Sequence, residues 1–379
     1  MMSAEFLVNA YIDANILLAL AVLTMLLGRA LMTWAGFGTA FRAQLTLVTG
    51  VLVTLALVPV ISFGSSFVSQ LALPRASDFL VSQFLNGRID MSATDFGQML
   101  GLRDRFVAEV VSPSNAVSWA LLALALSVAA GLAFQVLRNI SRLRAVLGTA
   151  YTIRRHGRIR IMSADSISVP FTARGLWAYY VVVPARMLAD NAEAKIAIGH
   201  ELQHIRQGDA EWEIAIEVLR PLLFWNPAYW AIRSQLRALR EYACDQEFLA
   251  RSRLDRRSYG TCLIDVAERA IAQREQTATG AFSVPLIETA AILRTTGSSS
   301  LGRRIHALTR AASRRPSLVL VYCLILPLSF ALVFASQSIQ PPQGWSHDRI
   351  MLTTVINLER VHSLNAANSA FAAPFATPN

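Results

Sequence analysis

Lysine is almost missing from this chain: Lys195 is the single lysine among 35 basic residues in a total of 379. Cysteine is scarce too, and none of the three falls in a segment assigned below to the outside, so no outer disulfide is expected. Charged residues make up only 16% of the chain, whereas 54% of it is hydrophobic. This composition is typical of a membrane protein, and no internal repeat is present.

Four apolar stretches are long enough to cross about 30 Å of hydrocarbon, which takes roughly 20 residues of helix. They cover about residues 15–34, 45–63, 117–136 and 317–336. A buried helix of a soluble protein is the alternative for each stretch alone, but four of them favour membrane spans. No basic residue precedes the first stretch and Glu5 and Asp13 are acidic, so the N-terminal segment does not resemble a secretory signal peptide.

Arginine predicts the orientation of these spans. Of the 35 basic residues, 27 lie between the third and fourth stretches. Positive charge favours the cytoplasmic side, which predicts an inner-membrane protein with both termini outside and residues 138–316 in the cytoplasm. Residues 1–137 then contain three spans and an outer loop at 64–114, although that loop carries four arginines. Residues 337–379 are expected to form a short, disordered outer tail.

The net charge of +10 could instead indicate a nucleic-acid surface. Many of the arginines flank the ends of the spans, and the others alternate with Asp and Glu on predicted helices. We therefore expect contact with the lipid bilayer and no direct binding of nucleic acid.

The stretch His200-Glu201-Leu202-Gln203-His204 predicts a metal site. Residues four apart on a helix share a face, so both imidazoles can reach one ion, and Glu201 lies close enough to take a proton from a metal-activated water. Asp190 and Asn191 are suitable N-cap residues for such a helix. The alternative is a surface helix with two solvated histidines.

Two histidines do not complete a catalytic zinc site, which needs a third protein ligand. Asn226 and Pro227 predict the start of a second helix, on which Glu241 and Asp245 lie four residues apart and share a face. Glu241 is the candidate third ligand, and Asp245 is the candidate acceptor for the other ring proton of a ligating histidine. The alternative is a solvated face whose acids pair with Arg237 or Arg240.

These residues resemble a known family. The His-Glu-Leu-Gln-His motif, Asp209 shortly after it, and the later Phe-Trp-Asn-Pro-Ala-Tyr-Trp and Arg-Glu-Tyr-Ala-Cys-Asp stretches are similar to the BlaR/MecR membrane zinc metallopeptidases, which act as antirepressors and beta-lactam sensors. The resemblance covers roughly residues 10–335 and is sharpest over 196–250. It implies Zn2+ bound by His200, His204 and Glu241, with Glu201 as general base. It also matches Asp209 and Asp245 to acidic positions of the family pattern.

The fold that follows is an α-helical membrane protein with four transmembrane helices and an α+β gluzincin-like metallopeptidase domain inserted between helices three and four. The family's beta-lactam sensors carry a Ser-x-x-Lys nucleophile in an outer domain. Here Ala192 stands three residues before the only lysine, and the tail is too short for that domain, so no covalent beta-lactam binding is expected. A signal would arrive through the outer loop, the tail, a partner or the bilayer.

Within the cytoplasmic region, the pattern predicts strands over 153–162 and 177–183. The second strand could offer an open edge to a peptide or be an ordinary core strand. Residues 273–300 are expected to form a loop with weak helices, and 301–311 a basic amphipathic helix. Cys244 could ligate the metal, but a small buried side chain is favoured. Neither Tyr242, Tyr259 nor an arginine stands out as the stabiliser of an oxyanion.

The predicted activity is metal-assisted peptide hydrolysis, directed at a cytoplasmic transcriptional repressor, at the chain itself, or at both. A housekeeping membrane protease, like the prenyl-protein and heat-shock families, is a second hypothesis. A non-catalytic transducer that keeps the zinc domain as a scaffold is a third. The intact Glu201 argues against the third hypothesis, because a scaffold needs no base.

Overall fold

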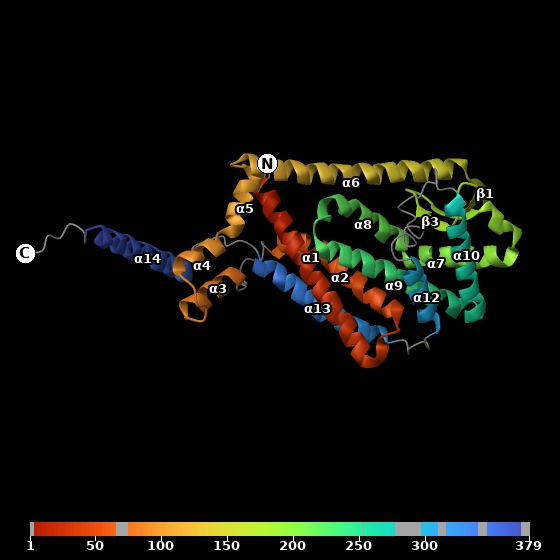
Figure 1. Ribbon diagram of the computed structural model, residues 1–379. Coiled ribbons are helices and arrows are strands. Elements are labelled where there is room, and N and C mark those ends of the chain that lie inside the picture. Colours follow the sequence, from red (N-terminus) through yellow and green to blue (C-terminus); the bar gives the residue numbers. More distant parts are fainter. Residues whose placement is uncertain are drawn as a thin grey trace, which may run out of the picture. The chain divides into compact units, whose positions relative to one another are not determined.

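The structure is a computed structural model that describes residues 4–65, 75–252, 254–276, 297–309, 316–339 and 347–372 (Figure 1). Most of these residues are helical, and four short strands form one mixed sheet. The chain divides into two compact units. The first comprises Met1–Ala21, Val53–Leu124 and Ser329–Asn379, and the second comprises Val22–Leu52 and Ala125–Leu328.

Four helices in the described part of the chain are long and apolar enough to cross a membrane, and they overlap the four predicted stretches. They cover Ala4–Phe37, Phe41–Ile61, Ala116–Thr149 and Leu318–Ile339. The corresponding elements are α1 (Ala4–Met32) with a π-helical turn at Thr33–Phe37, α2 (Phe41–Ser65), α6 (Ala116–Thr149) and α13 (Leu318–Ile339). The first begins well before the predicted position 15, and α6 continues beyond the predicted end at 136.

The first unit contains a small helical cluster. Its elements are α3 (Ala76–Leu85), α4 (Ala93–Leu100), α5 (Leu102–Val111) and α14 (His347–Ala372). Val81, Phe96 and Leu352 form its buried core, and the rings of Phe84 and Phe96 stack with centroids 4.3 Å apart. The prediction of a disordered tail is therefore wrong for 347–372, because apolar side chains of α14 pack against α3 and α4.

The sheet belongs to the second unit. Its strands are β1 (Tyr151–His156), β2 (Ile159–Ala164), β3 (Phe171–Arg174) and β4 (Tyr179–Pro184), in the order β1-β2-β4-β3. β1 pairs antiparallel with β2, β2 parallel with β4, and β3 antiparallel with β4. The single strand predicted over 153–162 is instead a hairpin, which turns at Gly157 with a positive φ of 56°.

The strand predicted over 177–183 is β4, and it is paired on both sides. It is therefore a core strand, and the open-edge alternative does not apply to it. The edge beside the motif helix belongs to β3, which contacts β4 on one side and has no partner strand on the other among the described residues. Sequence alone could not order the strands, because β3 has only four residues.

Helices cover both faces of the sheet. Met162, Phe171 and Val182 form an apolar core, against which Leu143 and Val146 of α6 pack. The opposite face carries α7, which contacts β3 and β4. The remaining elements are a 3-10 turn at Ala185–Ala189, α7 (Asn191–Gln207), α8 (Asp209–Leu223), α9 (Pro227–Arg251), α10 (Arg256–Gln276) and α12 (Gly297–Thr309). Most of the loop predicted over 273–300 lies outside the described residues.

Candidate metal centre

Helix α7 carries the two motif histidines. The Asp190 carboxylate caps its first turn and accepts hydrogen bonds from the backbone N–H groups of Ala192 and Glu193. One turn apart on this helix, the Nε2 atoms of His200 and His204 lie 3.1 Å from each other. The two side chains are only 11% and 12% exposed, so the alternative of solvated surface histidines does not hold.

A glycine turn places the acid behind His204. Gly208 ends α7 in the left-handed conformation, at φ 73° and ψ 28°, and α8 begins at the next residue. The Oδ2 atom of Asp209 consequently lies 2.7 Å from Nδ1 of His204. When the imidazole is neutral and its Nδ1–H donates to this carboxylate, Nε2 carries the lone pair and can bind a metal ion.

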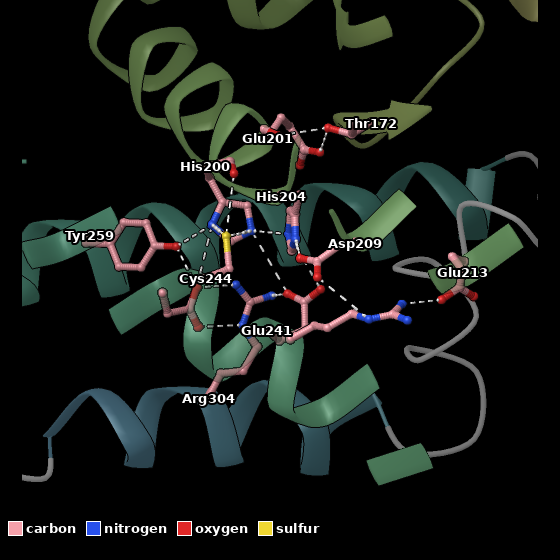
Figure 2. A network of polar contacts seen from close by, with 12 residues as sticks. Thr172, His200, Glu201, His204, Asp209, Glu213, Glu241, Cys244, Tyr259 and Arg304 are labelled. Carbon is pink, nitrogen blue, oxygen red and sulfur yellow. Dashed lines mark hydrogen bonds and ion pairs between the residues drawn. The ribbon is translucent and has the colours of Figure 1, made fainter. Parts of the chain in front are cut away.

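Helix α9 carries Glu241, the predicted third metal ligand. The Asn226 side chain caps its start by accepting from the N–H of Ala228, with Pro227 in the first turn. Glu241 lies within reach of both histidines: its Oε1 is 3.7 Å from Nε2 of His204, and its Oε2 is 4.0 Å from Nε2 of His200 (Figure 2).

The approach of α7 to α9 depends on a missing side chain. A Cβ atom at Gly199 would lie 2.6 Å from Cε2 of Phe248, a separation that real Cβ atoms do not show. Gly199 directly precedes His200, and Phe248 lies on the same helix as Glu241, so α7 and α9 pack closely beside the proposed ligands.

Asp245 lies one step further from the histidine than predicted. The hydroxyl of Tyr259, a fully buried residue of α10, lies 2.9 Å from Nδ1 of His200 and donates to Oδ1 of Asp245 over 2.7 Å. Asp245 itself is 3.6 Å from that ring nitrogen. The Tyr259 hydroxyl therefore accepts a hydrogen bond from His200 and donates one to the Asp245 carboxylate. Both bonds lie on the Nδ1 side of the His200 ring, away from Nε2.

Arg304 completes the cluster and was not among the predicted site residues. It lies on α12 and donates through Nε and Nη2 to Asp245, at 2.9 and 2.7 Å, while its Nη1 forms an ion pair with Oε2 of Glu241 at 2.8 Å. Burial lowers the pKa of Arg304, but Asp245 and Glu241 outweigh it and hold the pKa well above its usual value. Arg237 and Arg240, the suggested partners, both form ion pairs with Glu213.

Cys244 is buried and lies beside His200. Its Sγ lies 3.5 Å from Nδ1 and 4.0 Å from Nε2 of His200, and His200, His204 and Cys244 bring their ligand atoms within 4.8 Å of one another. Burial raises the pKa of the Cys244 thiol to about 12. Burial also raises the pKa of Glu241, but Arg304 and both histidines lower it below its usual value, so the carboxylate is the donor already in its ligand form.

Glu201 faces the edge strand. Thr172 of β3 donates its hydroxyl to Oε2 of Glu201 at 2.7 Å and also contacts the Glu201 carbonyl oxygen at 3.1 Å. Burial raises the pKa of Glu201 above its usual value, partly opposed by His204 and by the Thr172 hydroxyl. A base with a raised pKa takes protons more readily near neutral pH.

The region where α1 leads into α2 also touches α9, within the second unit. It contacts α9 at three points, which lie on either side of Glu241 in the sequence. These are Arg29 Nη1 to Gln235 Oε1 at 2.9 Å, Gln246 Nε2 to the Thr39 carbonyl at 3.2 Å, and the rings of Phe41 and Tyr242 at 5.0 Å.

The donor atoms fit a zinc ion. Both histidines have Nδ1 engaged, which leaves two Nε2 atoms on the same side. Oε2 of Glu241 is paired with Nη1 of Arg304 at 2.8 Å, which leaves Oε1, 3.7 Å from Nε2 of His204, as the oxygen available to a metal ion. Two imidazoles and one carboxylate form the three-ligand set of catalytic zinc sites, with one position left for water.

A comparison with known families agrees with this chemistry. The family model described as BlaR1 peptidase M56 matches residues 9–288, well over half of the chain. The match includes His200, Glu201 and Glu241 but ends before Arg304. No curated protein matches the chain.

Proposed function

Since this chain belongs to the BlaR1 peptidase M56 family, we propose that it is a membrane zinc endopeptidase of the antirepressor type. In this proposal His200, His204 and Glu241 hold Zn2+. Glu201 is the general base, and Asp209 and Asp245 act behind the histidines. The observation that carries the proposal is the convergence of the two Nε2 atoms, 3.1 Å apart, and one ionised, largely buried carboxylate on one point.

The bound ion would supply Lewis acidity, which polarises the scissile carbonyl and lowers the pKa of water toward about 7. Glu201 removes a proton from the attacking water as its oxygen bonds to the carbonyl carbon. It then delivers that proton to the amide nitrogen as the carbon–nitrogen bond breaks. Thr172 keeps the Glu201 carboxylate oriented during both transfers.

The edge of β3 offers a place for the substrate. An extended peptide can add to an open strand edge through backbone hydrogen bonds. Because Thr172 of β3 contacts Glu201, a peptide paired with this strand would pass directly beside the general base. The proposed substrate is a protein, namely a cytoplasmic transcriptional repressor, the chain itself, or both.

The arginine distribution supports the proposed topology: four spans in the inner membrane, both termini outside, and the peptidase domain of residues 138–316 in the cytoplasm. The lipid bilayer is then a partner, and neither nucleic acid nor a covalently bound beta-lactam is expected. A housekeeping membrane protease is the second candidate. A non-catalytic transducer is less well supported, because Thr172 keeps the base oriented for chemistry.

The test replaces Glu201 by Gln in the full-length protein, purified in detergent or nanodiscs. We expect the Glu201→Gln variant to retain zinc and to lose cleavage of a co-expressed repressor or of itself by about 10²–10⁴-fold. Glu268 is an exposed carboxylate on α10, and the control variant Glu268→Gln should leave zinc content and cleavage unchanged. Undiminished cleavage by Glu201→Gln would reject the mechanism. A winged-helix repressor encoded beside this gene would favour regulation over housekeeping.

A further inference from the structure

We infer that Arg304 is a positioning residue of the metal centre, which sets the orientation of Glu241 and Asp245 from a helix outside the family match. The inference rests on the proposed function, because it concerns the geometry of the proposed zinc ligands. Arg304 is placed neither on the metal nor on the substrate. It acts through the carboxylates that it contacts.

The contacts of Arg304 divide its guanidinium between two acids. Nε and Nη2 make a two-point contact with Asp245, and Nη1 faces Oε2 of Glu241 at 2.8 Å. The other oxygen of Glu241, Oε1, is thereby the one nearest to Nε2 of His204. Such a division needs the planar fork of an arginine, since a lysine presents one point charge.

Electrostatic repulsion explains why this pair of acids needs a cation. Glu241 and Asp245 lie one helical turn apart on α9, and like charges at this spacing repel each other. Asp245 is buried and Glu241 largely so, at 3% and 17% side-chain exposure, where water screens the repulsion weakly. Without Arg304, the Glu241 side chain would be expected to turn away from Asp245 and from the histidines.

The same guanidinium also influences His200, through Asp245 and Tyr259. Asp245 accepts from Tyr259, and the Tyr259 hydroxyl lies 2.9 Å from Nδ1 of His200. Arg304 therefore fixes the far end of the chain of contacts that orients the first histidine. One residue influences two of the three proposed ligands, through Glu241 directly and through Asp245 and Tyr259 indirectly.

The experiment measures metal binding rather than cleavage. Full-length protein in nanodiscs is stripped of metal and titrated with Co2+, whose visible spectrum reports ligand geometry, and Zn2+ affinity is measured against a competing chelator. We expect Arg304→Gln to weaken Zn2+ binding by about 10–100-fold and to change the Co2+ spectrum. Arg304→Lys should recover part of the affinity, because the charge remains, but not the wild-type spectrum.

Arg303→Gln is the matched control, since Arg303 is an exposed neighbour on the same helix, and it should bind both metals as the wild type does. Wild-type affinity and an unaltered spectrum in Arg304→Gln would overturn the inference. If Arg304→Gln does not fold, an unaltered spectrum in Arg304→Lys would overturn it. The proposed function fails separately, if the wild-type protein itself binds no Zn2+.

Discussion

The two histidines are supported in different ways. His204 donates to Asp209, five residues further along the chain, through a single 2.7 Å contact built by one helix–glycine–helix turn. His200 is supported by Tyr259 from α10, which leads on to Asp245 of α9 and to Arg304 of α12. One side of the centre is thus local, and the other is assembled from three packed helices.

Both sides end in an arginine. Asp209 lies 3.7 Å from Nε of the buried Arg240, just as Asp245 contacts Arg304. The two sides differ in which helix carries the arginine. Arg240 belongs to α9 itself, whereas Arg304 belongs to a helix that must dock on α9. The assembled side can therefore be disturbed by movements that leave the local side intact.

The largest expected effect comes from removing the ligand of the assembled side. Glu241→Ala should weaken Zn2+ binding by more than about 100-fold, because a proposed ligand is lost and Arg304 is left with one carboxylate. Equilibrium dialysis with metal analysis measures this. Glu247→Ala, on the same helix, is the control. Wild-type zinc content in Glu241→Ala would show that Glu241 is not a ligand and would favour His200, His204 and Cys244 as the ligand set.

The second prediction compares the two supports directly. Asp209→Asn removes a charged acceptor and should lower Zn2+ affinity by about 10–100-fold. Tyr259→Phe removes a neutral hydroxyl while Asp245 keeps its two-point contact with Arg304, so the loss should be smaller than for Asp209→Asn. Chelator competition on both variants measures the difference. A larger loss in Tyr259→Phe would show that the assembled side dominates.

The smallest effect is expected at the base. Thr172→Val should leave Zn2+ binding unchanged and remove the hydroxyl that partly lowers the pKa of Glu201. The pKa then rises further, and because the base must be deprotonated, the acidic limb of kcat/KM should move to higher pH. A pH profile of cleavage measures the shift. An acidic limb at the wild-type pH would mean that the Thr172 hydroxyl does not lower the pKa of Glu201.

Local sequence predicted the local side. A cap at Asp190 and two histidines at helical spacing are set by neighbours in the chain, so spacing predicts their contacts, whereas Asp209 was indicated only by the resemblance to the family. The apolar helices were predictable for a similar reason, since length and composition suffice.

The assembled side was only partly predictable. Glu241 and Asp245 were found as a pair on one helix face, but their partners depend on how α10 and α12 pack. Tyr259 and Arg304 have no local pattern that marks them, because many tyrosines and arginines occur on amphipathic helices. The order of the strands was equally hidden, and with it the identity of the edge beside Glu201.

The contacts between the α1–α2 region and α9 couple the apolar helices to the proposed metal centre. Gln235, Tyr242 and Gln246 tie the helix that carries Glu241 to the turn between two apolar helices. Apolar helices tilt when the thickness of the lipid bilayer changes. A tilt of α1 and α2 would shift α9 through these contacts, which lie on either side of Glu241 in the sequence. Displacements of about 1 Å can change a rate by about two orders of magnitude, so we expect hydrolysis to respond to the thickness of the surrounding lipid.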